Sequence, residues 1–220
     1  LSTLLKHLSR TANPEIKRVT TNYDRIAEYA IDHAYLEFSS GFSGYYKQYF
    51  SGFQNNKKRH SNNIELLKVH GSLDWFVDED SNVVALPDAI NEGFNLMPLM
   101  VTPGVRKYEH THNEPFRSII TKSDETFEKA SSVLCIGYGF NDIHIQPKLI
   151  NKIRGGKIPI LIIARTLTER ALKFIRSSQD ENIIGIEMYS DGSKIISSFD
   201  NDIIIDEEIW SLSGLLNLIL

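Results

Sequence analysis

Three short apolar runs in this chain end abruptly in polar or glycine-rich residues, and this pattern constrains the fold most. The polar ends read Thr-Thr-Asn-Tyr-Asp (20–24), His-Gly-Ser (70–72) and Gly-Tyr-Gly-Phe-Asn-Asp (137–142). Short apolar runs with such boundaries are typical of buried strands. In open α/β sheets, the carboxyl ends of parallel strands line one crevice in which ligands bind. The pattern therefore allows all three polar ends to converge on one site.

Helix and strand patterns alternate along the second half of the chain. The strands Val133–Ile136 and Ile158–Ile163 are apolar on both faces, as expected for a sheet that is buried on both sides. This alternation predicts βαβ units, and therefore an α/β fold with a parallel sheet and helices on both faces. The expected helices lie at 115–130, 144–154 and 168–177, the last capped by Thr166 or Thr168, and a further strand lies at 183–187.

The first half carries a less regular pattern. Asp24 is a good N-cap for a helix from Arg25 to about Tyr35. The other expected elements are a helix end at 1–10, strands at 17–21 and 64–69, and a β-hairpin that turns at 78–82.

Two further stretches are interpreted as additions to the sheet. Residues 37–63 are rich in Gly, Ser and aromatic residues and predict an insertion packed by its own Tyr and Phe side chains, while 87–112 is expected to be irregular. The predicted organisation is one domain over 1–200, with insertions at about 37–63 and 76–114. An acidic segment and a short helix follow at 201–220.

Composition excludes several classes of protein. The formal net charge is −4, which argues against nucleic acid as a direct partner because phosphate binding needs a basic face. We interpret the one basic run, Asn55–His60, as a solvated surface. No apolar stretch approaches the roughly 20 residues that span a bilayer, so no membrane partner is expected. The single cysteine, Cys135, rules out an internal disulfide and a multi-cysteine zinc site, and indicates a cytoplasmic protein.

Each candidate residue has a structural alternative when it is taken alone. Asn22 also suits the end of a strand, and His70 also suits a buried, hydrogen-bonded histidine. The Gly137-x-Gly139 pair resembles part of a dinucleotide turn but is weak by itself. Residues His110 and His112 offer a metal pair, although two histidines in an irregular polar loop are more often solvated, and no metal is expected.

Together, and in this order, the three motifs resemble the sirtuin superfamily, above all the sirtuin-like domains of bacterial anti-phage defence proteins. The resemblance covers roughly residues 17–165 and implies a Rossmann-like sheet. Protein deacylases of that superfamily carry a four-cysteine zinc ribbon after the catalytic histidine, which Cys135 alone cannot form. The resemblance therefore implies the zinc-free branch that consumes NAD. The first strand of the family and its glycine-rich pyrophosphate loop are expected upstream of Leu1.

The resemblance also implies roles for individual residues. Asn22 orients the attacking water, and His70 serves as the base or as the partner of a ribose hydroxyl. An amide offers both a donor and an acceptor, and an imidazole exchanges a proton near neutral pH. Asp24 is open to two readings, as a helix cap alone or also as a site residue. The residues expected to bind NAD are Thr21, Asp24, Gly71, Gly137, Gly139, Asn141, Asp142 and Arg165. The role of the segment Val101–Lys107 is left open.

Two functions of different classes follow. The first is hydrolysis of NAD to nicotinamide and ADP-ribose by an oligomeric effector that depletes the cell of NAD. The second is a nucleotide-binding or assembly module that serves a partner such as a HerA-like ATPase or an Argonaute. The presence of both Asn22 and His70 favours the enzyme, because a degenerate module would be expected to lose one or both.

Overall fold

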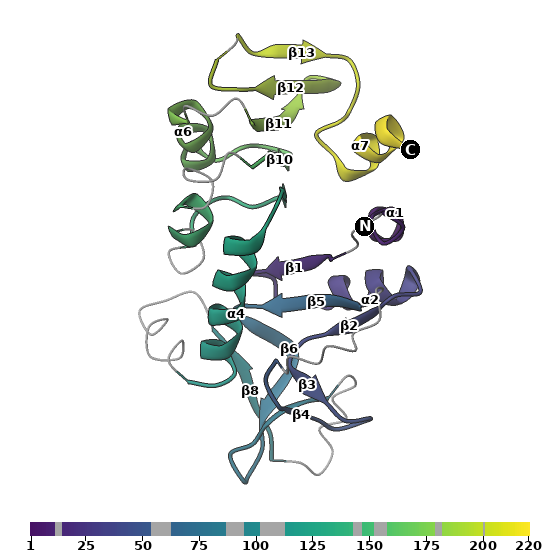
Figure 1. Cartoon of the computed structure of the whole chain (residues 1–220), viewed down its shortest axis with the longest axis vertical. Helices are drawn as coiled ribbons and strands as arrows, with labels where there is room; N and C mark the ends of the chain where they lie inside the picture. Colours follow the sequence, from purple (N-terminus) through teal and green to yellow (C-terminus); the bar gives the residue numbers. More distant parts are fainter. Residues whose placement is uncertain are drawn as a thin grey trace. The chain divides into compact units, whose positions relative to one another are not determined.

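The computed structural model describes residues 1–11, 15–53, 63–86, 95–101, 113–142, 147–151, 158–178, 182–199 and 201–220. The chain divides into two compact units, Leu1–Ser123 and Asp124–Leu220. Each unit combines parallel strands with helices (Figure 1), and this mixed α/β architecture confirms the predicted fold class. Among the described residues, no helix has both the length and the apolar character that crossing a membrane requires.

The first unit contains helices at both ends of its sequence and short strands between them. Its elements are α1 (Ser2–Leu8), β1 (Lys17–Thr20), α2 (Ile26–His33), β2 (Glu37–Ser39), β3 (Phe42–Ser43), β4 (Gln48–Phe50), β5 (Asn63–Lys68), β6 (Gly71–Val77), β7 (Val83–Ala85), β8 (Met97–Met100) and α4 (Phe116–Lys129), which continues past the boundary of the unit. The expected helices at 1–10 and 25–35 and the strands at 17–21 and 64–69 are confirmed to within two residues at each end.

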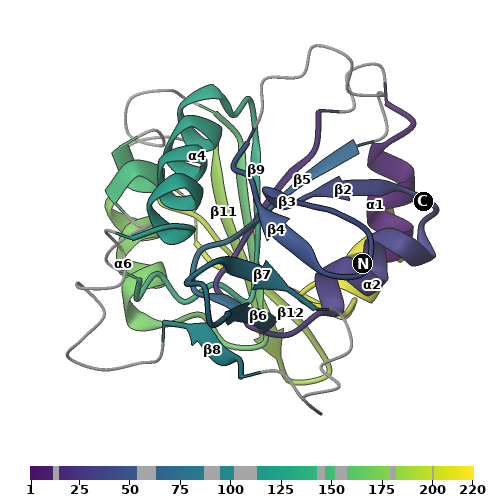
Figure 2. The ribbon, with the colours of Figure 1, turned by 90° about the horizontal axis from the view of Figure 1, so that it is seen from below.

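A parallel three-stranded sheet with the order β1-β5-β2 forms the centre of the first unit. The middle strand, β5, is buried from Ile64 through Lys68, so both of its faces are covered. Leu66 packs with Leu5 of α1 and Ile31 of α2 in one apolar core. Figure 2 shows these two helices side by side. The parallel pairing matters for function because it brings the ends of β1 and β5 to the same edge of the sheet.

A second sheet in this unit is antiparallel and has the order β3-β4-β7-β6-β8. The hairpin predicted around 78–82 is confirmed as β6 and β7. The expectation of irregular structure throughout 87–112 is wrong for Met97–Met100, which forms β8 against β6. Pro98 indicated a break, but β8 lies at the edge of the sheet, where proline is tolerated. Within 37–63, β2 joins the parallel sheet, and β4 pairs with β7.

The second unit holds a five-stranded sheet with the order β13-β12-β11-β10-β9. Its elements are β9 (Val133–Ile136), β10 (Ile160–Ala164), α6 (Glu169–Ser177), β11 (Ile183–Tyr189), β12 (Gly192–Ile196), β13 (Ile203–Ile205) and α7 (Leu212–Ile219). The first three strands are parallel, as predicted, whereas β12 and β13 are antiparallel and escaped the sequence analysis. Residues 147–151 are helical, and the rest of the helix expected at 144–154 lies outside the described residues.

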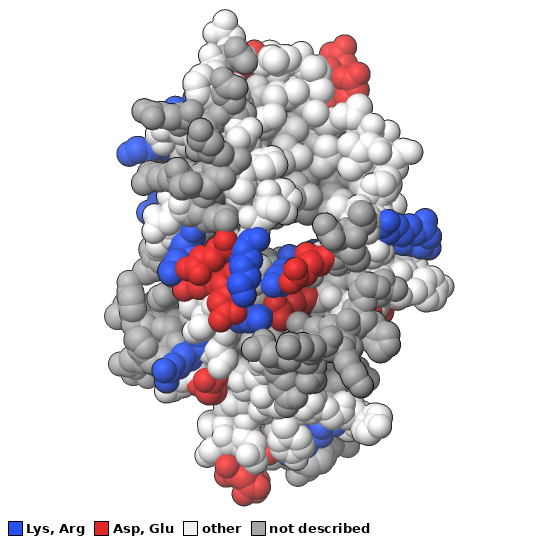
Figure 3. All heavy atoms as spheres, in the orientation of Figure 1, with Lys and Arg blue, Asp and Glu red and all other residues white. Residues whose placement is uncertain are grey.

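Charged side chains of both signs mix on the face that Figure 3 draws. Lys and Arg side chains lie next to Asp and Glu side chains there, and no large patch of a single sign is visible among the coloured residues of that face. Ion pairs join Lys47 to Asp78 at 2.9 Å and Lys194 to Asp202 at 2.8 Å.

Cys135 gives a direct readout of the integrity of the second unit. It lies in β9 and is 7% exposed, and burial raises the pKa of its thiol to about 12. Since the thiolate is the reactive form, we expect a thiol reagent at pH 8 to label Cys135 only after urea has unfolded the protein. The measurement is the rate of labelling against urea concentration. Labelling of the native protein at the rate of an exposed thiol would contradict this burial.

Candidate functional site

The ends of β1 and β5 place Asn22 and His70 at equivalent positions. Thr20 and Lys68 are partners in the parallel register, and Asn22 and His70 each follow two residues later. The Val69 N–H donates to the Thr20 carbonyl at 3.1 Å, so the pairing continues past the end of β1. We expect Asn22, His70 and Gly139 to lie at the same edge of one parallel sheet; this is confirmed for Asn22 and His70. It is wrong for Gly139, because β9, which precedes it, is hydrogen-bonded in the separate five-stranded sheet.

Asn22 presents its side chain to solvent. The residue is exposed, and its backbone N–H donates to the Thr20 Oγ1 atom at 3.2 Å. This local bond fixes the backbone of Asn22 without using its amide side chain. Thr21, which precedes it, is half-buried. An exposed amide beside a strand end is free of core packing and suits contact with a small ligand.

His70 is buried and is held through Val101. It is 7% exposed, and its carbonyl accepts from the Val101 N–H at 2.9 Å. The Tyr23 hydroxyl donates to the Val101 carbonyl at 2.6 Å, and the Tyr23 and His70 rings lie 6.3 Å apart between centroids. Val101 therefore ties the first motif to the second. The rest of the segment 101–107 lies outside the described residues.

Asp24 stabilises the start of α2, although not as its N-cap residue. Helix α2 begins at Ile26 with Arg25 as the N-cap, and the Asp24 Oδ1 atom accepts from the Ile26 N–H at 2.9 Å. The prediction of Asp24 as N-cap is therefore wrong by one residue. Aspartate readily accepts from the backbone two residues on, and that bond displaces the expected position of the cap.

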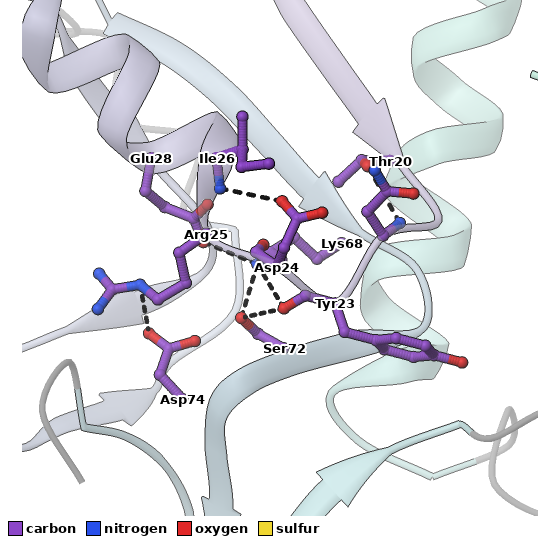
Figure 4. Close-up of polar contacts among 10 residues, drawn as sticks. Thr20, Tyr23, Asp24, Arg25, Ile26, Glu28, Lys68, Ser72 and Asp74 are labelled. Carbon is purple, nitrogen blue, oxygen red and sulfur yellow. Dashed lines mark hydrogen bonds and ion pairs between the residues drawn. The ribbon is translucent and has the colours of Figure 1, made fainter. Parts of the chain in front are cut away.

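Lys68 is the residue of this region that sequence reasoning missed. Its ammonium is 1% exposed and donates to the Asp24 carbonyl at 2.6 Å, the Ser72 Oγ at 2.6 Å and the Glu28 Oε1 at 2.9 Å (Figure 4). A longer contact of 3.4 Å reaches the Tyr23 carbonyl. The signal in the sequence is a lysine inside an apolar strand, two residues before the His-Gly pair. Lysine is almost never fully buried unless it is paired.

A second ion pair joins the same two segments. The Arg25 Nε atom lies 3.4 Å from the Asp74 Oδ2 atom, and Figure 4 shows this pair beside the Lys68 cluster. Arg18 of β1 is half-buried; burial lowers its pKa, and the nearby carboxylates of Asp24 and Glu28 oppose that shift. Arg18 of β1 and Lys68 of β5 therefore both interact with the carboxylate of Glu28 in α2.

Gly71 has a structural reason to be glycine. Its φ is +90°, and a Cβ atom there would lie 2.5 Å from the Leu99 carbonyl oxygen and 3.1 Å from the Met100 Cα. Strand β8 of the chain itself therefore approaches Gly71 closely. Its expected contact with NAD stays a prediction.

The third motif follows β9 in the second unit and is anchored to α6. Thr168 caps α6 by accepting from the Ala171 N–H at 3.2 Å, and its hydroxyl donates to the Gly139 carbonyl at 2.6 Å. The Gly137 N–H donates to the Ile163 carbonyl at 2.8 Å. Of the two caps that the sequence allowed, Thr166 and Thr168, the structure uses Thr168, and the same hydroxyl fixes the glycine-rich turn.

The remaining residues of this motif are divided between core and surface. Phe140 is fully buried with a φ of +55° and stacks on Phe174, so it anchors a turn that costs backbone strain. Asn141 is exposed and Asp142 is 9% exposed. The pKa of Tyr138 is raised, mainly by burial and to a smaller extent by the nearby charge of Asp142.

Arg165 follows β10, and its side chain is exposed. Its carbonyl accepts from the Met188 N–H at 3.1 Å. Gly137, Gly139, Asn141, Asp142 and Arg165 belong to the second unit, whereas Asn22 and His70 belong to the first. Their convergence on one site stays a prediction.

Metal ligands were searched within the described part of the chain. No group of three or more His, Cys, Asp or Glu side chains there is arranged to hold a metal ion. The candidate pair His110 and His112 lies outside the described residues.

The environments of two glycines predict different costs of substitution. We expect Gly71→Ala to lower the free energy of unfolding by more than about 3 kcal/mol, because strain at positive φ adds to a backbone clash. Gly137 also has a positive φ, +63°, but open space surrounds its Cβ position, so Gly137→Ala should cost only about 1–2 kcal/mol. Urea unfolding of both variants measures the difference. Equal costs would show that β8 does not approach Gly71 this closely.

Comparison with known families agrees with the strand-end motifs. The family described as "SIR2-like domain" matches residues 17–171, which is more than half of the chain. This range includes all three motifs and Arg165. A search among curated proteins found no match. SIR2-like domains bind NAD, and the family includes NAD-dependent enzymes. With this match over β1, β5, β9 and the turns that follow them, the chain belongs to the SIR2-like domain family.

Proposed function

We propose that the protein hydrolyses NAD⁺ to nicotinamide and ADP-ribose, with Asn22 and His70 as catalytic residues. The observation that carries the proposal is the register of β1 and β5, in which Thr20 pairs with Lys68 and the two candidate residues follow at equal offsets. Membership of a family that binds NAD supplies the substrate class. The pairing supplies two complementary side chains, an exposed amide and a buried imidazole.

The proposed reaction begins at the ribose carbon C1′ that carries nicotinamide. The bond between C1′ and the nicotinamide nitrogen breaks, and its electron pair neutralises the pyridinium ring. Water attacks C1′ as the ribose develops oxocarbenium character, and the attacking water loses one proton. The products are nicotinamide, ADP-ribose and that proton.

Asn22 is proposed to orient the water and the ribose. Its carboxamide carries both a donor and an acceptor, so it can bind a water and a sugar hydroxyl together. The exposed side chain of Asn22 and its fixed backbone support this role. Orientation of this kind is worth a large factor in rate because a small misplacement of the reacting atoms costs about 10²-fold.

His70 is proposed to take the proton, either from the water or through a ribose hydroxyl. His70 is buried, and the bond from the Val101 N–H to its carbonyl restricts its backbone. A general base typically contributes ~10²–10⁴-fold to the rate. Contacts with NAD stay predictions for Thr21, Asp24 and Gly71 in the first unit and for Gly137, Gly139, Asn141, Asp142 and Arg165 in the second.

The proposed biological setting is anti-phage defence. The resemblance of residues 20–24, 70–72 and 137–142 to bacterial sirtuin-like domains supports a cytoplasmic effector that depletes NAD. Uncontrolled loss of NAD would kill the host cell. We therefore propose that an oligomer, or a partner such as a HerA-like ATPase or an Argonaute, controls the activity.

Replacement of each catalytic residue tests the function. We expect Asn22→Ala and His70→Ala each to reduce nicotinamide release by at least ~10²-fold, because they remove the orienting amide and the base. The assay follows nicotinamide release from NAD under conditions in which the wild-type protein is active, with a melting curve for each variant.

Matched controls separate catalysis from general effects of substitution. His33 and Asn201 are exposed, so His33→Ala and Asn201→Ala should retain wild-type rates. Full activity in a folded His70→Ala protein would remove His70 from the proposed mechanism, whereas no nicotinamide release from the wild-type protein would favour a nucleotide-binding module.

A further inference from the structure

We propose that Lys68 is a positioning residue, whose buried ammonium locks the first two motifs together and so sets the placement of Asn22 relative to His70. This inference rests on the proposed NAD hydrolysis, because it assigns a role within that same site. Lys68 touches neither candidate catalytic side chain in the proposed reaction. It acts through the backbone between them.

The contacts of Lys68 bridge segments that are far apart in the sequence. Its Nζ atom donates to the Asp24 carbonyl at 2.6 Å and to the Glu28 Oε1 atom at 2.9 Å, which belong to the first motif and to α2. It also donates to the Ser72 Oγ atom at 2.6 Å, which belongs to the second motif. An ammonium has three N–H donors, so these three short contacts use its full capacity.

The Tyr23 carbonyl receives further donors from the second motif. The Leu73 N–H donates to it at 3.0 Å, and the Ser72 hydroxyl lies 3.3 Å away. Figure 4 shows this carbonyl turned toward Lys68 and Ser72, while the aromatic ring of Tyr23 points away from them. Tyr23, which follows Asn22, is therefore held by donors from three residues of the segment that carries His70, namely Lys68, Ser72 and Leu73.

The burial of these charged and polar groups costs free energy, because each of them loses its contacts with water. Lys68 is 1% exposed, Glu28 is 5% exposed and Ser72 is fully buried. A buried ion pair must overcome the desolvation of both charges, and apolar side chains of similar volume often give equal or greater stability. Charged donors, however, fix carbonyls and carboxylates in direction, which apolar groups do not. The role of Lys68 is therefore to fix the positions of the Asp24 carbonyl, the Glu28 carboxylate and the Ser72 hydroxyl.

The test separates stability from position by removing both charges. In Lys68→Met/Glu28→Met, no unpaired charge stays buried, so the thermal midpoint should recover most of the loss caused by Lys68→Met alone. We expect kcat for NAD hydrolysis to stay about 10²-fold below wild type in the double variant, because the placement of Asn22 is lost. KM should change far less, since the effect falls on the transition state.

A second readout does not depend on activity. Hydrogen exchange should accelerate at the backbone amides of 22–26 in the double variant, while exchange in β9–β11 stays at the wild-type rate. Lys68→Gln/Glu28→Gln provides a second folded protein if the methionine pair fails to fold, and the same results are expected. Lys47→Met removes a surface partner of Asp78 and should leave both readouts unchanged.

The outcomes distinguish this inference from the proposed function. If the wild-type protein releases no nicotinamide, the proposed hydrolysis fails, and hydrogen exchange alone decides the role of Lys68. If the wild-type protein is active and a folded double variant keeps its kcat and its exchange rates, Lys68 has no positioning role and the hydrolase proposal stands.

Discussion

The parallel pairing of β1 with β5 is the constraint on which the candidate site depends. It matches Lys17 with Glu65 and Thr20 with Lys68, so the two strands end together. A shift of one residue in this register would reverse the faces of every side chain in β1. It would also separate the residues that follow, Asn22 and His70. The buried core shared by β5, α1 and α2 keeps that register fixed.

The sequence predicts the parts of the fold that local pattern determines. The strands β5, β9 and β10 are short, mainly apolar runs, and their limits follow from the polar residues beside them. Strand β1 is Lys-Arg-Val-Thr, so its position follows mainly from the polar motif after it. The cap of α6 is readable to within two residues, because Thr166 and Thr168 both precede the helical pattern and threonine suits an N-cap; the structure uses Thr168. The equivalent positions of Asn22 and His70 were predictable for the same reason: each directly follows a strand.

Features that depend on tertiary contacts were not predictable. Strand β8 contains Pro98, and only its place at a sheet edge makes that residue acceptable. Strand β12 begins at Gly192, and the Asp191-Gly192 pair is a turn signal that the helix–strand alternation obscured. Lys68 stands inside an apolar strand, and nothing local reveals that a carboxylate, a carbonyl and a hydroxyl from three segments surround its ammonium.

The most direct measurement of the proposed site is a crystal structure of the Asn22→Ala protein with NAD⁺, in which slow turnover preserves the substrate. We expect the nicotinamide ribose to lie within hydrogen-bond distance of the His70 imidazole, beside the end of β1. NAD⁺ bound with its nicotinamide ribose away from both β1 and β5 would contradict the proposed site, even if the protein proved to be an enzyme.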